Sequence, residues 1–139
     1  SRPMVGALST GLAQRALDES VAYAKGRQSF GRPIHEHQGV GFKISEMGMR
    51  TEAARLLTRQ AAWRKDRGED NTLYSSYAKA FGSDTAMWAA TEAVQILGGY
   101  GYSKEYPAEK LMRDAKVMQI YEGTNEIQRL VMLRQLTRA

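Results

Sequence analysis

Apolar residues recur at steps of three and four along almost the whole chain, and no long stretch alternates with a period of two. This spacing places apolar side chains on one face of an α-helix, so the pattern predicts an all-α protein. It runs through three long segments, at residues 3–25, 38–67 and 72–97, and a shorter helix is expected at residues 107–116. A last helix is expected from Asn125 onward. Long antiparallel helices joined by short loops form an up-and-down helical bundle.

The apolar positions also predict which side of each helix is buried. The first helix carries two adjacent stripes, and the third is apolar on two faces, which is typical of a central helix. We expect Met47 and Met49 of the second helix to fill the core. The residues expected to face inward in the first and last helices are Val5, Leu8, Leu12, Ala13, Ala16, Leu17, Val21 and Ala24, and Ile127, Leu130, Leu133 and Leu136.

Residues with special backbone preferences mark the ends of these helices. Glycine follows each long segment, at Gly26, Gly68 and Gly98, and glycine tolerates the left-handed conformation in which many helices end. Asn125 and Gln128 are expected to form the N-cap and N3 pair of the last helix. The stretch between the last two helices has no clear helical period.

Length and charge narrow the class of protein. A chain of 139 residues corresponds to one domain, and because it opens without an initiator methionine we expect it to be a piece of a longer protein. No apolar run approaches the roughly 18 residues that span a bilayer. The absence of cysteine excludes disulfides and thiolate metal sites. The net charge of +5 would suit a polyanionic partner, either a nucleic acid or a phosphate-rich cofactor. Alternatively, the excess of basic residues belongs to the surface of a fragment whose acidic partners lie elsewhere.

Two apparent motifs carry no chemistry of their own. His35 and His37 lack a third ligand, so no metal site is predicted. The glycine-rich stretch at residues 98–101 follows a helix instead of a strand, and therefore does not form a dinucleotide-binding fingerprint.

Glu122 stands out among the acidic residues. It lies in an apolar and aromatic loop, directly before Gly123 and just ahead of the last helix. An apolar setting raises the pKa of a glutamate toward the range in which it acts as a base, and glycine lets a ligand approach the backbone closely. A solvent-facing loop glutamate would fit the same residues, so this pattern leaves both interpretations open.

Four sequence blocks resemble those of acyl-CoA dehydrogenases, in the same order as in that family. Residues 121–129 are similar to the family motif YEGT-x-x-IQR, and residues 26–31 to its R-x-[ST/A]-F-G stretch. Residues 95–101 resemble the block QxxGG-x-G, and residues 106–116 the run YPxEKLMRDAK. The resemblance extends over essentially the whole chain. It implies the family's C-terminal helical domain, with the N-terminal helical and middle β-domains outside residues 1–139.

The resemblance also implies a reaction. Family members use FAD to convert an acyl-CoA thioester into a trans-2-enoyl-CoA, a step of fatty acid β-oxidation. A glutamate removes the α proton, and Glu122 matches that catalytic base. The backbone N–H of the same residue helps to hold the thioester oxygen as negative charge develops. A minority branch places the base near the start of this domain, at the position of Ser1, which cannot serve as that base.

The resemblance further implies binding residues and partners. A homotetramer arranged as a dimer of dimers, electron-transfer flavoprotein as the electron acceptor, and an inactive isolated chain are expected. In the family, the residue matching Arg27 meets the FAD of a neighbouring subunit. The residues matching FAD contacts are Arg27, Ser29, Phe30, His37, Gln38, Gln95, Gly98, Gly99, Thr124 and Glu126. Those matching positions near the thioester and coenzyme A are Arg2, Tyr121 and Gly123.

Other functions remain open at this stage. A related flavoprotein, either an acyl-CoA oxidase or a DNA-associated adaptive-response member, would share these blocks. No recognised DNA-reading motif supports nucleic acid as a partner. A helical oligomerisation module without activity is the alternative from another class. We expect the protein in the bacterial cytoplasm or the mitochondrial matrix, away from membranes.

Overall fold

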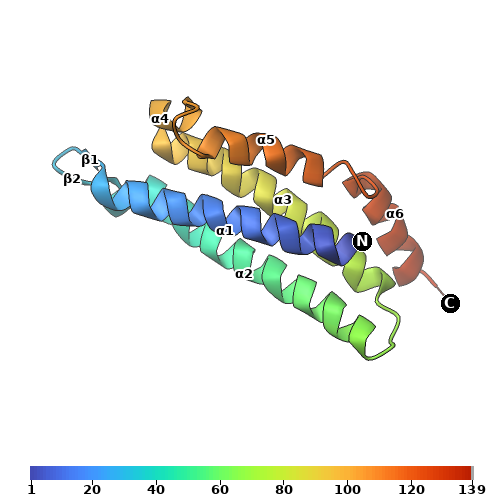
Figure 1. Cartoon of the computed structure of the whole chain (residues 1–139). Helices are drawn as coiled ribbons and strands as arrows, with labels where there is room; N and C mark the ends of the chain where they lie inside the picture. Colours follow the sequence, from blue (N-terminus) through green and yellow to red (C-terminus); the bar gives the residue numbers. More distant parts are fainter. Residues whose placement is uncertain (139) are drawn as a thin grey trace.

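A computed structural model describes residues 1–138 and shows a helical bundle (Figure 1). The elements in chain order are α1 (Arg2–Gly26), β1 (Gln28–Ser29), β2 (Arg32–Pro33), the 3-10 helix η1 (Ile34–Glu36), α2 (Gln38–Asp66), α3 (Thr72–Leu97), α4 (Gly99–Tyr102), α5 (Ala108–Met118) and α6 (Asn125–Leu136). The all-α prediction is confirmed, and the three long helices start and end within a few residues of the predicted bounds.

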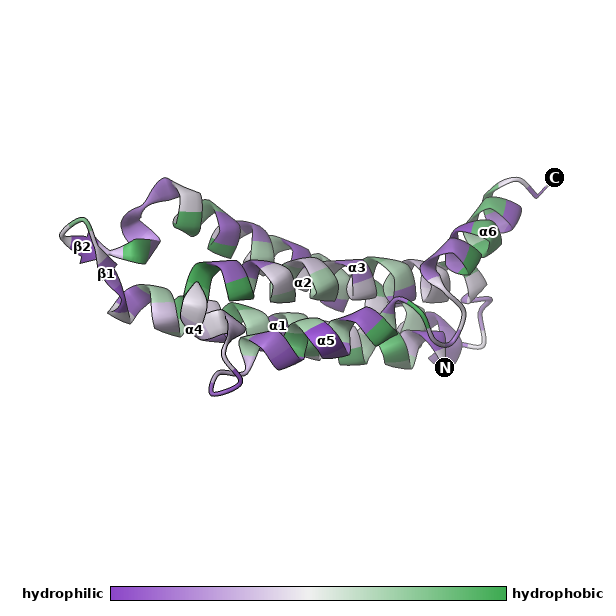
Figure 2. Ribbon diagram, turned by 90° about the horizontal axis from the view of Figure 1, so that it is seen from above, coloured by the Kyte–Doolittle hydropathy of each residue, from purple (hydrophilic) through white to green (hydrophobic). Residues whose placement is uncertain are grey.

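Helix α3 occupies the centre of the bundle and packs against α1, α2, α5 and α6. Helices α1, α2 and α3 lie lengthwise beside one another, and α5 runs along α3 on the side away from α2 (Figure 1). The prediction that the third helix is central is confirmed. Helix α6 turns away from the bundle at the end where α1 begins (Figures 1 and 2).

The core is built largely from small residues, which lets α1 and α3 approach closely. A Cβ atom added at Gly82 of α3 would lie 3.3 Å from the carbonyl oxygen of Gly6 on α1. One added at Gly6 would lie 3.1 Å from the carbonyl oxygen of Ala78. Close packing of this kind leaves no space for larger side chains. The fully buried alanines of the two helices are Ala13, Ala16, Ala24, Ala78, Ala86, Ala89, Ala90 and Ala93.

Several residues predicted to face inward are exposed. Met47 is fully buried as predicted, but Met49 and Leu8 are largely exposed. All four apolar residues of α6 named above are also exposed, from Ile127 at 48% to Leu136 at 63%. Helix α6 packs against α3 but projects beyond the bundle (Figure 2), and these four side chains lie on its exposed side. Periodicity identifies the apolar face of a helix but does not show that its partner lies in the same chain.

Three local features were not predicted. The loop after α1 contains a two-stranded antiparallel hairpin, in which Ser29 pairs with Arg32. The aromatic loop after α3 begins with the short helix α4. The predicted cap of α6 was wrong by one residue, because the Thr124 hydroxyl accepts a hydrogen bond from the Ile127 N–H while Asn125 is buried inside the protein. Within residues 1–138, no helix is both long enough and apolar enough to cross a lipid bilayer.

Candidate functional site

Glu122 lies at the tip of a short loop that joins α5 to α6. A backbone hydrogen bond from the Asn125 N–H to the Gln119 carbonyl, 3.0 Å long, closes this loop at its base. Glu122 has a φ of 55° and Gly123 a φ of 87°. A left-handed backbone is costly for a residue with a side chain, and such strain concentrates at functional sites.

The carboxylate of Glu122 is exposed and meets the start of α1. The Ser1 hydroxyl donates a hydrogen bond to Glu122 Oε2 at 2.7 Å. In the described residues, no acceptor takes the Glu122 N–H. The apolar surroundings expected from the sequence are therefore not provided by this chain, although Tyr121 and Ile120 stand beside the carboxylate in sequence and are themselves partly exposed.

A buried polar cluster lies under this loop. Asn125 is 4% exposed, and its Oδ1 accepts a hydrogen bond from Lys79 Nζ at 2.8 Å. Its Nδ2 donates to Asp84 Oδ1 at 2.7 Å and to Ser83 Oγ at 2.8 Å. Burial lowers the pKa of the Lys79 ammonium below its ordinary value, while the carboxylates of Asp84 and Glu126 act in the opposite direction. Helix α3 is thus joined to the first residue of α6 through the Asn125 side chain, which also donates to the Ala80 carbonyl at 3.5 Å.

Gln128 folds back onto the same loop. Its side chain is 2% exposed, and Nε2 donates to the Gly123 carbonyl at 3.0 Å and to the Glu122 carbonyl at 3.4 Å. At the start of α6, the Glu126 carboxyl accepts hydrogen bonds from its own N–H and from Thr124, and these hold its pKa below the usual range. Thr124 and Glu126 are therefore committed mainly to capping α6.

The other group of predicted cofactor residues lies on the hairpin after α1. Phe30 and Gly31 form its two-residue turn, both with positive φ, as a type I′ turn requires. Phe30 is 97% exposed although it is a large apolar residue. An exposed aromatic ring on a strained backbone is typical of a surface that another molecule covers.

His37 is held beside this turn in one tautomer. Arg32 Nη2 lies 3.2 Å from His37 Nδ1, and since a guanidinium has only donors, Nδ1 must accept. The ring proton of the neutral form is therefore on Nε2, which donates to the Ser29 carbonyl at 3.0 Å. Gln38, the next residue, is exposed at the start of α2.

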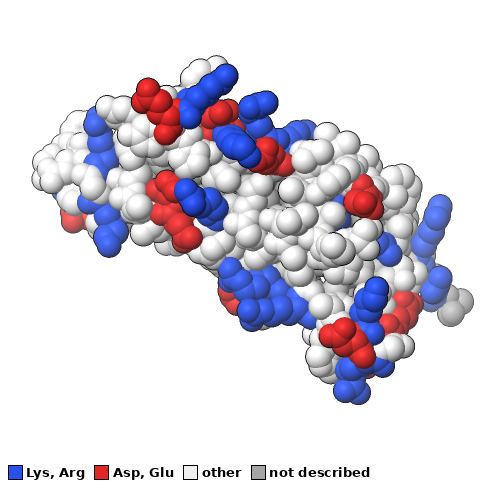
Figure 3. Space-filling view, in the orientation of Figure 1, with Lys and Arg blue, Asp and Glu red and all other residues white. Residues whose placement is uncertain are grey.

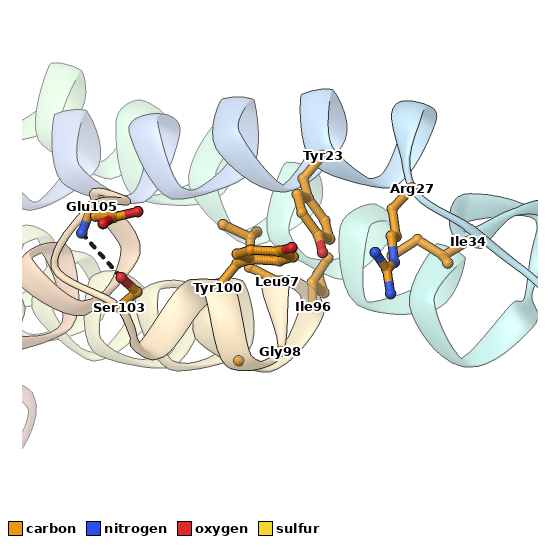
Figure 4. Close-up of a pocket in the computed structure, with 10 residues that line it drawn as sticks. Tyr23, Arg27, Ile34, Ile96, Leu97, Gly98, Tyr100, Ser103 and Glu105 are labelled. Atoms are coloured by element: carbon orange, nitrogen blue, oxygen red, sulfur yellow. Dashed lines mark hydrogen bonds between the residues drawn. The ribbon is translucent and has the colours of Figure 1, made fainter.

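A cavity of about 570 Å³ lies next to the hairpin (Figure 4). The rings of Tyr23 and Tyr100, 6.3 Å apart, stand over it, and the Arg27 side chain lies at its far side. Gly98 and Gly99 contribute bare backbone to the wall, whereas Gln95 is exposed one turn earlier on α3 and does not line the cavity. The remaining lining residues are Ile34, Ile96, Leu97, Ser103 and Glu105.

The predicted site residues thus form two clusters at opposite ends of the bundle. The loop cluster contains Tyr121, Glu122, Gly123, Thr124 and Glu126, and Arg2 joins it, with its Nη1 donating to Ser76 Oγ at 2.7 Å. The hairpin cluster contains the remaining predicted residues, which are Arg27, Ser29, Phe30, His37, Gln38, Gln95, Gly98 and Gly99. Helix α1 separates the two, and its 25 residues span about 37 Å.

Sequence reasoning missed the polar residues that support the loop. Lys79 and Asp84 lie on α3, far from the motif in sequence, and no spacing rule connects them to Glu122. The one available signal was a lysine within an otherwise alanine- and serine-rich buried face. Charged side chains are interspersed on the face shown in Figure 3, so the net charge of +5 does not gather there into one basic patch.

Comparison with known proteins identifies the class of this fold and site. The family model for the C-terminal domain of acyl-CoA dehydrogenase matches residues 1–137. The chain is 51% identical over 139 residues to a probable acyl-CoA dehydrogenase, FadE25, of Mycobacterium tuberculosis, a match that covers 99% of this chain and 36% of the relative. Butyryl-CoA dehydrogenase from Megasphaera elsdenii superposes with a TM-score of 0.97 at 49% identity, over 99% of this chain and 36% of that structure. The FAD complex of PigA superposes with a TM-score of 0.92 at 32% identity, over 94% of this chain and 34% of that one.

This chain belongs to the acyl-CoA dehydrogenase family, a family of flavoprotein oxidoreductases, and it corresponds to their C-terminal helical domain. It spans about 36% of the length of the relatives it matches.

Proposed function

We propose that the chain is the C-terminal domain of a longer FAD-dependent acyl-CoA dehydrogenase and that Glu122 is its catalytic base. Family membership supports the class of enzyme. The observation that carries the assignment of the base is the backbone of Glu122, whose φ of 55° is maintained on an exposed loop. A protein retains such strain where the surrounding structure enforces it for a purpose.

The chemistry assigned to this chain is proton abstraction and oxyanion stabilisation. The Glu122 carboxylate takes the proton from the α carbon of an acyl-CoA thioester as the α,β double bond forms. The N–H of Glu122, which has no acceptor among the described residues, donates to the thioester oxygen and stabilises its developing charge. FAD, when bound, supplies the acceptor for the hydride that leaves the β carbon. Gly123 lets the acyl chain approach the backbone, and Arg2 and Tyr121 serve as further substrate contacts.

The hairpin cluster suits the diphosphate and adenosine portions of FAD. The Arg27 guanidinium matches phosphate oxygens, and Gly98 and Gly99 offer backbone without side chains beside an open cavity. The exposed Phe30 ring provides an apolar surface for the cofactor. Because α1 is longer than FAD, one cofactor that contacts both clusters requires two copies of the chain. We therefore place each FAD between the loop cluster of one subunit and the hairpin cluster of its neighbour.

This arrangement supports a homo-oligomer, arranged in the full enzyme as a dimer of dimers. The exposed apolar side of α6 is consistent with such contacts. We propose electron-transfer flavoprotein as the electron acceptor and, because the relatives are bacterial, the cytoplasm as the compartment. The isolated chain holds only parts of each site, so we expect it to bind no FAD and to be inactive.

The test is the substitution Glu122→Gln in the longer enzyme, followed by anaerobic bleaching of the flavin by acyl-CoA. Glutamine keeps the size and the backbone N–H of the residue but does not accept the α proton.

A further inference from the structure

Asp84 on α3 holds both ends of the loop that carries Glu122. Its Oδ1 accepts a hydrogen bond from Gln119 Nε2 at 2.8 Å and another from Asn125 Nδ2 at 2.7 Å. Gln119 is the first residue after α5, and Asn125 is the first residue of α6. One carboxylate oxygen therefore connects the residue before the loop to the residue after it, while Oδ2 accepts from Arg129 Nη2 at 3.0 Å.

We propose that Asp84 is a positioning residue for Glu122. It acts through the loop, without contact with Glu122 itself, by anchoring to α3 the side chains of Gln119 and Asn125, whose backbones already bond to each other at the base of the loop. This inference rests on the proposed role of Glu122 as the base. It assigns to α3, the central helix of the bundle, the function of setting the geometry of the catalytic loop.

The charges on α3 also determine how the Asn125 amide is oriented. Lys79 has only hydrogen-bond donors, so the Asn125 oxygen must face it. A carboxylate only accepts, so the Asn125 NH₂ group must face Asp84. An amide of the opposite orientation would break both bonds and leave buried polar groups without partners, which is unfavourable. Lys79 and Asp84 thus select a single position for the start of α6.

The strained tip of the loop needs this support. A left-handed Glu122 persists only where its surroundings over-determine the backbone. Gln128 holds the tip by its bonds to the Glu122 and Gly123 carbonyls, but Gln128 is itself placed by α6. The position of α6 depends in turn on Asn125, which binds Asp84.

A purely stabilising ion pair with Arg129 does not account for these contacts of Asp84. The Asp84 and Arg129 side chains are 41% and 59% exposed, and exposed ion pairs contribute little to stability. The two amide bonds at Oδ1 are part-buried and converge on one atom. The distinguishing property of Asp84 is therefore its link to the loop.

The experiment compares Asp84→Ala with Glu92→Ala in the longer enzyme. Glu92 is the matched control, because it is a carboxylate of the same helix that pairs across helices, with Lys43 of α2, and touches no residue of the loop. Two properties are measured in each variant. The first is the limiting rate of anaerobic flavin bleaching, separated from the affinity for acyl-CoA. The second is amide hydrogen exchange of the peptide covering residues 119–125.

For Asp84→Ala we expect a bleaching rate lower by about 10- to 100-fold, as for small displacements of catalytic groups, with FAD content and acyl-CoA affinity retained. Exchange should accelerate in residues 119–125 and not elsewhere. Glu92→Ala should change neither property. If Asp84→Ala does not yield a folded protein, Gln119→Ala replaces it. The Gln119 side chain is half-buried, and its truncation removes one of the two amide bonds to Asp84.

Unchanged bleaching and unchanged exchange in the Asp84 or Gln119 variant would overturn the inference. So would equal losses in the Glu92 control, which would show a general effect on stability. The proposed function fails separately, if Glu122→Gln bleaches normally. In that case, faster hydrogen exchange of residues 119–125 in Asp84→Ala would still show that Asp84 positions the loop, but the loop would have no role in proton abstraction.

Discussion

The hydroxyl of Ser1 donates a hydrogen bond to the carboxylate of Glu122 at 2.7 Å, although 121 positions separate the two residues in the chain. Ser1 is the N-cap of α1, and Glu122 lies at the tip of the loop between α5 and α6. The two positions at which acyl-CoA dehydrogenases are expected to carry their base therefore adjoin in space. One substrate α carbon can face either of them.

This proximity predicts that the base can be moved. In the longer enzyme, Glu122→Gly should lose activity by at least the 10²- to 10⁴-fold that general-base catalysis contributes. Glycine suits the φ of 55° at this position, so the loop should keep its shape. Adding Ser1→Glu to this variant should restore about tenfold or more of the lost rate. Steady-state dehydrogenation of acyl-CoA measures both steps, and a double variant as inactive as Glu122→Gly would refute the shared position.

Gly123 should be required for stability as well as for substrate access. Its φ is 87°, and a Cβ at this position would lie 2.8 Å from Gln128 Nε2. We expect Gly123→Ala to lower the free energy of unfolding by about 1–2 kcal/mol. Gly48→Ala is the control, because Gly48 lies inside α2 with no atom within 4 Å of the added Cβ, and it should stabilise by about 0.5–1 kcal/mol. Urea unfolding measures both, and shifts of the same sign would contradict this account.

Lys79 should make the stability depend on pH in the alkaline range. Its pKa in the folded protein is lowered by burial, so between that value and the ordinary lysine value the unfolded chain binds more protons than the folded one. Stability contributed by this position therefore rises as pH rises through that window and falls as pH is lowered. The stability of the wild type relative to Lys79→Met should increase between about pH 7 and about pH 10. Urea titrations at both pH values measure it, and a constant difference would show that Lys79 does not titrate in this way.

Placing each FAD between two subunits predicts complementation. Subunits with Glu122→Gln and subunits with Arg27→Ala should each form enzymes of low activity. In a mixed dimer, one site receives both defects and the other receives an intact Glu122 from one chain and an intact Arg27 from its neighbour. Co-expression of the two variants should therefore recover activity above either parent. If both clusters served one site within a single chain, mixing would recover nothing.

The bundle could be predicted from sequence because apolar residues recur at steps of three and four through its long helices. The 3-4 spacing of α2 predicts seven inward positions. Four of them, Met47, Thr51, Ala54 and Ala61, are buried, and the other three, Val40, Ile44 and Leu57, are half-buried. The same spacing failed for α6, whose apolar residues face outward. That failure is physical, since the apolar pattern of a helix does not show whether the surface that covers it belongs to the same chain.

The site was predictable only as far as the motif reaches. Glu122 and Gly123 are adjacent in sequence, and glycine signals the positive φ. Ser1, Asp84 and Lys79 approach Glu122 or its loop only through the tertiary fold, and no local pattern indicates them. Asn125 illustrates the competition between local and tertiary effects. It is a good capping residue by propensity, but it binds Lys79 and Asp84 instead, and Thr124 takes the cap.

The central claim is that Glu122 removes the α proton. The most direct measurement is single-turnover bleaching of the flavin by acyl-CoA, without oxygen, in the longer enzyme carrying Glu122→Gln. Glu126→Gln, four residues along on the first turn of α6, serves as the control and should bleach at close to the wild-type rate. We predict that Glu122→Gln still binds FAD and acyl-CoA but bleaches about 10²- to 10⁴-fold more slowly or not at all. Bleaching of Glu122→Gln at the wild-type rate would contradict the claim and place the base elsewhere.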